Sequence, residues 1–299
     1  MGASLYRNVF GVSAMLARNS STRAWLLLLP VMLFLAVLAA AALAVLRMSV
    51  GTNGDEWHGF SLTSYADLIK PYYVKSALLT MRLAFQSTVF AVLLAIPVAI
   101  AMARAKSKLA QRLLLTGVLL PLLVNLLLQS YGWLIILGPA GVLNNTLLSL
   151  GIVQRPIQWL YRENGVLLGL IQTAFPLAVL PMASAMKAVS GTYEEAAATL
   201  GANRWQIMRH ILLPMAMPGI LSGALLVFAY NASAFAVPLL LGGRRVNMLA
   251  VLVRDQIAPL LNWSGASASG IALMVATLAV MAVSQKLVQR SQRIVGSAS

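Results

Sequence analysis

The sequence predicts an all-α membrane protein with six transmembrane helices. Hydrophobic residues make up 60% of the 299 residues and charged residues only 10%, whereas a soluble domain carries about 25% charged residues. The 22 basic and 7 acidic side chains cannot cover a globule of this length, so a soluble enzyme is excluded. The apolar residues also gather into runs of about 20, which is the length that crosses a bilayer core.

Each predicted span is an apolar run bounded by charged or turn residues. The first run is longer than the apolar part of a signal peptide, and Arg7, Arg18 and Arg23 precede it, so we expect a retained helix. The six runs cover residues 24–46, 76–101, 113–137, 164–186, 216–241 and 266–285.

Loop charge predicts that both termini are cytoplasmic. With the N-terminus inside, the cytoplasmic segments hold 13 of the 22 basic residues and only two acids, Glu194 and Glu195. The compact basic cluster at 104–112 lies between two closely spaced spans, where positive charge sets orientation. Lysine and arginine in such loops explain the net charge of +15, so the charge does not indicate a nucleic-acid-binding protein.

The expected organisation is one membrane domain. We predict a cytoplasmic tail at 1–23, a six-helix transmembrane domain at 24–286 with a cytoplasmic loop at 188–215, and a cytoplasmic tail at 287–299. Two external stretches, 142–153 and 247–261, are too short to span, so we expect them at the interface or folded back against the bundle.

Polar and aromatic residues cluster at membrane depth in three of the predicted spans. Such groups need partners in a bilayer, so the clusters indicate either hydrogen bonds between helices or the wall of a polar path for a solute. The first cluster is Asn125, Gln129, Tyr131 and Trp133, the second Gln172, Thr173 and Phe175, and the third Tyr230, Asn231, Ser233 and Phe235.

Several reactive groups are missing from the sequence. No apolar run contains an Asp or Glu, which argues against the ion-coupling site of a secondary transporter. His58 and His210 have no metal-binding spacing, so membrane proteases and enzymes of lipid chemistry lack their reactive groups. No glycine is followed by lysine, so a phosphate-binding loop is absent. We therefore expect no metal site, and any nucleotide that drives this protein must be bound by another chain.

The loop between the fourth and fifth spans carries the most specific pattern. Thr192 and Glu195 have the spacing of a capping box, which predicts a short helix from Tyr193 that stops at Gly201. A second helix is predicted over 204–213, and its apolar stripe consists of Trp205, Met208 and Leu212. Such a helix pair suits docking into a groove of a partner protein.

This loop resembles the EAA–x3–G–x9–I–x–LP loop of bacterial ABC-importer permease subunits. The fixed positions match at Glu195, Ala196, Ala197, Gly201, Ile211, Leu213 and Pro214. Further pieces between 75 and 285 resemble the polyamine (spermidine/putrescine) branch, including AIPVAIAMAR at 95–104, SYGWLIIL at 130–137, GVLNNTLLSLGI at 141–152 and FAVPLLLGG at 235–243.

The resemblance implies a type I ABC-importer permease fold in a bacterial inner membrane. It implies a second, different permease subunit, an external solute-binding protein, and a cytoplasmic ATPase dimer that binds ATP and Mg. Glu195 would pair with a basic group of the ATPase, and Gly201 would form the bend. The expected coupling residues are Glu194, Glu195, Ala196, Ala197, Gly201, Ala202, Trp205, Met208, Leu212 and Pro214.

The solute stays open at this point. A polyamine would find no acidic residue at membrane depth, although aromatic faces offer cation–π contact and the partner permease could supply charge. The same branch resembles importers of other solutes, so an amino-acid-like, phosphonate or metal-complex solute is the alternative. An ion-coupled secondary transporter is the rival from another class.

Overall fold

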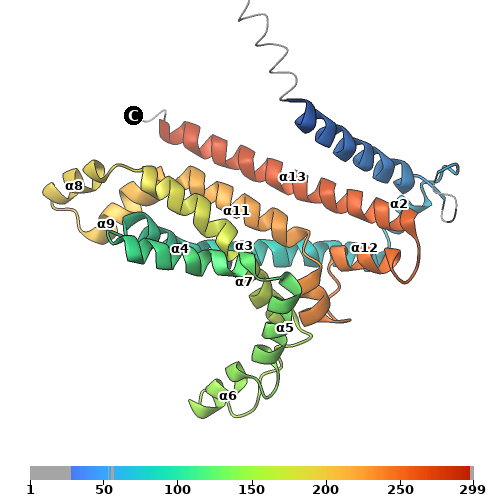
Figure 1. The fold of residues 1–299 in the computed structure, drawn as a ribbon, viewed down its shortest axis with the longest axis horizontal. Coiled ribbons are helices and arrows are strands. Elements are labelled where there is room, and N and C mark those ends of the chain that lie inside the picture. Colours follow the sequence, from blue (N-terminus) through green and yellow to red (C-terminus); the bar gives the residue numbers. More distant parts are fainter. Residues whose placement is uncertain (1–27, 53, 55–56, 297–299) are drawn as a thin grey trace, which may run out of the picture.

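The computed structural model describes residues 28–52, 54 and 57–296, and the described chain is helical throughout its core (Figure 1). Among these residues, five helices are long and apolar enough to cross a membrane. A bent pair, Arg204–Met215 and Met217–Ala232, passes the same test as a sixth span. The predicted tail at 1–23 lies outside the described residues.

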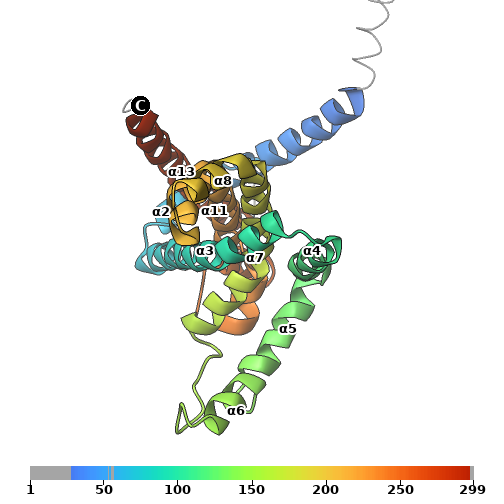
Figure 2. The same cartoon turned by 90° about the vertical axis from the view of Figure 1, so that its left-hand side faces the viewer.

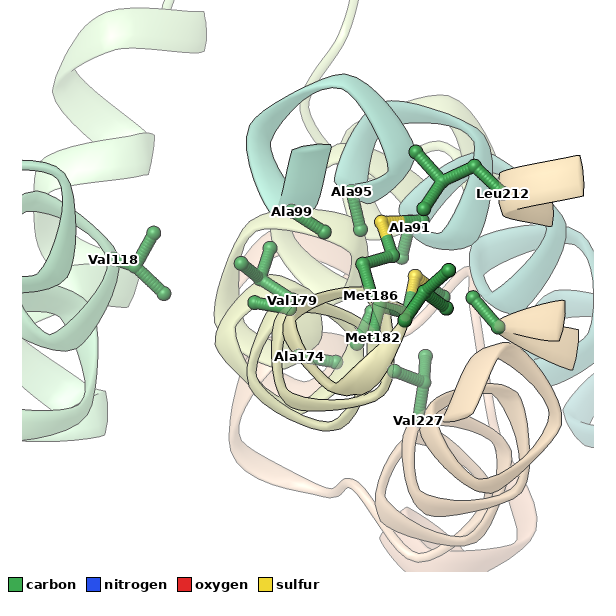
Figure 3. Packing of buried hydrophobic residues seen from close by; sticks show 14 residues of the cluster. Ala91, Ala95, Ala99, Val118, Ala174, Val179, Met182, Met186, Leu212 and Val227 are labelled. Atoms are coloured by element: carbon green, nitrogen blue, oxygen red, sulfur yellow. The ribbon is translucent and has the colours of Figure 1, made fainter. Parts of the chain in front are cut away.

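Three helices form the centre of the bundle: α3 (Pro71–Arg104), α7 (Glu163–Ala188) and α11 (Met217–Ala232). Helices α3 and α7 confirm the predicted runs 76–101 and 164–186, and each helix extends beyond its run at both ends. The facing surfaces are lined with small residues, which let helix backbones approach closely in a membrane. Ala91, Ala95 and Ala99 of α3 meet Met182 and Met186 of α7 in one buried cluster (Figure 3).

The contact between α7 and α11 depends on glycine. A Cβ at Gly219 would lie 2.2 Å from the Cβ of Ala185, and one at Gly223 would lie 2.9 Å from the carbonyl oxygen of Ala178. Both separations are closer than real side chains permit, so only glycine fits there.

The third predicted span, 113–137, is not one helix. The structure has α4 (Lys108–Leu123) and α5 (Leu126–Leu137), which are separated by two extended residues, Val124 and Asn125. Asn125 breaks the run because its side-chain oxygen accepts a hydrogen bond from the Leu127 amide at 2.9 Å and so begins a new helix. Helix α5 leaves α4 at an angle and continues toward α6 (Val142–Ser149), as Figures 1 and 2 both show.

The fifth predicted span, 216–241, is also interrupted. Helix α11 ends at Ala232, and a π-helical turn, η2 (Pro238–Gly242), follows after a short break. Pro238 has no amide hydrogen to continue the helical ladder. The chain then forms α12 (Leu249–Ile257), whose Leu249, Val251 and Leu252 are buried. Of the two alternatives predicted for 247–261, a place at the interface or a fold back against the bundle, this packing favours the second.

Two long helices lie at the periphery, α13 (Trp263–Gly296) and the helix Leu28–Ser49. They meet only near α2 (Thr63–Asp67) and diverge from there (Figure 2). The Ser264 hydroxyl joins them, since it lies 3.1 Å from the Met48 carbonyl oxygen and 2.5 Å from that of Gly51. α13 contains the predicted run 266–285, and the described first helix starts four residues later than predicted because 24–27 lie outside the described residues.

Candidate functional site

The loop singled out in the sequence lies at one end of the bundle as two short helices (Figure 1). The first, α8 (Gly191–Thr199), begins two residues before the predicted start. Ser190 is its N-cap, because its hydroxyl accepts a hydrogen bond from the Thr192 amide at 3.3 Å. The predicted capping box of Thr192 and Glu195 is therefore wrong, since a better-placed serine precedes it.

Gly201 ends α8 as predicted. Its φ of +86° lies in the left-handed region that favours glycine. The Gly201 amide donates to the Ala198 carbonyl and the Ala202 amide donates to the Ala197 carbonyl, both at 3.0 Å. These two bonds form a Schellman motif, which satisfies the last carbonyls of α8 and turns the chain.

The second helix runs farther than predicted. α9 (Arg204–Ile207) continues through a π-helical turn, η1 (Met208–Leu212), into α10 (Leu213–Met215). The helix thus passes Pro214, and it bends by 67° where α11 begins. Its start is fixed by a capping box of Asn203 and Gln206, with hydrogen bonds of 2.8 and 2.9 Å. The N-x-x-Q spacing was the sequence signal for this box.

The predicted apolar stripe does not stay on one surface. The Trp205 side chain is 64% exposed, whereas Leu212 is 4% exposed and belongs to the central core cluster. Met208 is half-buried between them. The expectation that Leu212 faces a partner is wrong because the π-helical turn and the bend direct this residue toward α3 and α7. Trp205 remains as the exposed apolar residue of the stripe.

A groove of about 650 Å³ separates the loop from the end of α3. Charged residues line both of its walls: Arg104 and Lys106 beside α3, Glu194 and Glu195 on α8, and Arg204 on α9. Arg104 is ion-paired with Glu194, and both side chains are about 30% exposed. Glu195, one residue later, is exposed and is not ion-paired with any group in the described part of the chain.

A second pocket, of about 420 Å³, lies at the break between α4 and α5. Each of the three polar clusters contributes to its lining: the first through Asn125 and Gln129, the second through Thr173 and the third through Tyr230. The Gln129 side-chain amide donates to the carbonyls of Pro121 and Val124, the latter at 2.9 Å. It thus spans the break and satisfies backbone groups that α4 leaves open.

The remaining cluster residues are distributed elsewhere. The Trp133 indole donates to Gln172 at 3.1 Å, and Phe175 packs against the central core. Asn231 is fully buried and donates to the Ser87 hydroxyl at 2.8 Å, which makes it a link between α11 and α3. Tyr131 is exposed on α5, while Phe235 lines a separate pocket beside α12. For Asn231, the structure therefore contradicts a place on the path wall and favours packing.

No group of three or more potential metal-binding side chains occurs among the described residues.

The chain was compared with known proteins. The model of a family described as the binding-protein-dependent transport system inner membrane component matches residues 87–294. The spermidine/putrescine transport system permease protein PotB of Haemophilus influenzae is 34% identical over 236 residues, which are 78% of this chain and 82% of PotB. The putative 2-aminoethylphosphonate transport system permease protein PhnU of Salmonella typhimurium is 28% identical over 79% of this chain and 82% of its own.

A solved structure shares the fold. A chain of a bacterial ABC transporter involved in the import of the acidic polysaccharide alginate superimposes with a TM-score of 0.76. The match covers 92% of this chain and 98% of that chain at 19% sequence identity, which supports the fold alone.

Proposed function

The chain belongs to the family of inner membrane components of binding-protein-dependent transport systems, and we propose that it carries a small organic cation of the polyamine type. It is a multi-pass permease subunit of an ABC importer and not an enzyme. The observation that carries the proposed solute is the 34% identity to the spermidine/putrescine permease over 78% of this chain.

The transport path is formed together with a second permease subunit of different sequence. An external binding protein delivers the solute, and an ATPase dimer on the cytoplasmic side binds ATP and Mg, so this chain needs no cofactor of its own. Both termini lie in the cytoplasm, as does the loop that carries α8 and α9. The excess of basic residues in the segments assigned to that side supports this orientation.

The loop containing α8 and α9 is the surface that meets the ATPase. Three features support this assignment: the exposed Trp205, the exposed Glu195, and the fixed turn at Gly201. Tryptophan is among the residues that contribute most at protein interfaces, and Trp205 is the exposed aromatic side chain of α9. Movement of this loop would then reach the bundle through α10, which continues into α11.

Within the bundle, the solute passes the pocket at the α4–α5 break. Asn125, Gln129 and Tyr230 are the path residues gathered there, and Thr173 joins them from the middle of α7. Trp133 and Gln172, joined by their hydrogen bond, lie on the same two helices, α5 and α7. The similarity to PhnU supports 2-aminoethylphosphonate as the second candidate solute.

Reconstituted uptake tests this function. The permease, its partner permease, the ATPase and the binding protein are placed in proteoliposomes with ATP inside, and uptake of labelled spermidine and labelled 2-aminoethylphosphonate is compared. We expect ATP-dependent spermidine uptake that a hydrolysis-deficient ATPase abolishes. Uptake driven by a proton or sodium gradient without ATP would overturn the assignment, and a preference for the phosphonate would overturn the solute.

A further inference from the structure

The break between α4 and α5 leaves backbone carbonyls without partners at residues that line the pocket there. The last four carbonyls of a helix have no partner within that helix, and for α4 these belong to residues 120–123. The Leu120 carbonyl accepts from the Val124 amide at 3.3 Å, and that of Pro121 accepts from Gln129. Within the described part of the chain, the carbonyls of Leu122 and Leu123 accept no hydrogen bond.

The side chains around these carbonyls add further acceptors. The Gln129 Oε1 atom is buried behind the pocket lining and has no hydrogen-bond partner among the described residues, so its partial negative charge is not neutralised by a donor. The Thr173 hydroxyl donates its hydrogen to the Gly169 carbonyl at 2.9 Å, so only its lone pairs remain available. The pocket at the break is therefore rich in oxygen atoms that lack a donor.

The position of the break determines the electrostatics of the pocket. The C-terminal end of a helix carries about half a negative charge, and α4 ends here after 16 residues, beside Thr173 in the middle of α7. Irregular backbone at membrane depth is stable only against protein or a water-filled cavity. The C-terminal ends of interrupted helices in transporters coordinate cations.

We propose that this pocket is a binding site for a primary ammonium group of the transported solute. The group donates to the carbonyls of Leu122 and Leu123 and to the oxygen of the Thr173 hydroxyl, which together match the three hydrogens of an ammonium. This inference rests on the proposed cationic solute. It supplies a recognition site for a polycation in a chain whose apolar runs contain no Asp or Glu.

The natural absence of cysteine makes the pocket accessible to a direct test. Leu122→Cys places one thiol at the pocket lining, and Leu225→Cys places one in a separate apolar groove beside Phe85 and Val280. In the assembled transporter, each thiol is reacted with a cationic methanethiosulfonate ethylammonium and with an anionic ethylsulfonate reagent. The rates are divided by those for free glutathione, and labelling of this chain is read by mass spectrometry.

At Leu122→Cys, we expect the corrected rate for the cationic reagent to be at least about tenfold higher than that for the anionic reagent, a ratio that corresponds to about 1.4 kcal/mol. Spermidine should slow this reaction, and Leu225→Cys should show no such charge preference. Equal corrected rates for the two reagents at Leu122→Cys would overturn the site. The charge preference is measured without transport, so a failure of this site can be told apart from a failure of the proposed solute. If the proposed solute is wrong, wild-type proteoliposomes will take up no spermidine.

A second variant tests the site through uptake. Gln129→Lys keeps a donor for the Pro121 and Val124 carbonyls but adds a positive charge, whereas Gln129→Met has similar length and no charge. We expect Gln129→Lys to lower spermidine uptake by at least about tenfold more than Gln129→Met, with equal recovery of the assembled complex. Equal uptake by the two variants would contradict the proposal.

Discussion

Arg104, the last residue of α3, is ion-paired with Glu194 in the first turn of α8. The same guanidinium lies 3.5 Å from the Val189 carbonyl oxygen, in the segment that joins α7 to α8. The Arg104 side chain thus ties the loop that carries α8 to two central helices of the bundle, α3 and α7. Glu195, the residue after Glu194, is exposed. Glu194 therefore holds the loop against α3, whereas Glu195 is available to a partner; the sequence alone had assigned both acids to the contact with the ATPase.

Reversing either charge of this pair should weaken coupling. Arg104→Glu or Glu194→Arg removes a charged hydrogen bond worth about 1.5–3 kcal/mol and adds repulsion, so we expect at least about a tenfold fall in ATP-driven uptake. The double variant restores the pair with reversed polarity and should recover most of the uptake. Lys106→Glu, in the same groove but outside the pair, is the matched control. A double variant no better than the single ones would contradict the link.

Trp205 and Leu212 should respond differently to truncation. Trp205 is 64% exposed, so Trp205→Ala should leave the permease abundant and folded but unable to retain the ATPase, at a cost of about 2–4 kcal/mol in binding. Leu212 is 4% exposed, so Leu212→Ala should destabilise the permease itself by about 2–5 kcal/mol. Copurification and thermal unfolding distinguish the two effects, and a stable Leu212→Ala variant that loses only the ATPase would contradict the burial argument.

The turn at Gly201 should tolerate asparagine better than valine. The φ of +86° is strained for side chains other than glycine, and asparagine visits this region more readily than a β-branched residue. We expect Gly201→Asn to retain most ATPase stimulation and Gly201→Val to lose it, with both variants inserted in the membrane. Stimulation measured in proteoliposomes decides the point, and equal activity of the two variants would show that the turn is not required.

Tyr230 and Asn231 are adjacent but should have separate roles. Tyr230 lines the pocket at the α4–α5 break, so Tyr230→Ala should lower uptake while the abundance of the complex is unchanged. Asn231 donates to Ser87 inside the bundle, and Asn231→Ala should lower abundance, because it removes a buried hydrogen bond between α11 and α3 that is worth about 0.5–1.5 kcal/mol. Loss of abundance in proportion to uptake for Tyr230→Ala would assign it to packing instead.

The proposed orientation can be measured with reporters. A reporter that is active only in the cytoplasm should work when fused after Arg293 or inserted within the basic segment 104–112, because positive loops stay inside. The same reporter inserted beside His58 should be silent. Activity at His58 and silence within 104–112 would reverse the topology.

The sequence by itself determined the class of the protein and the place of its loop. Apolar runs and charge placement predict the membrane helices, since both follow from the cost of burying polar groups in lipid. The EAA-type spacing located α8 and α9, and Gly201 marked the turn because few residues adopt its backbone angle.

Only the tertiary structure decided which polar side chains act together. Hydrophobicity does not distinguish a continuous helix from two helices separated at Val124, because the break depends on a local cap and on the amide of Gln129. Likewise, Glu194 and Glu195 are equivalent in sequence, yet only Glu194 lies within reach of Arg104, 90 residues away. Pairing and burial of this kind arise from contacts between distant segments, which composition and spacing do not encode.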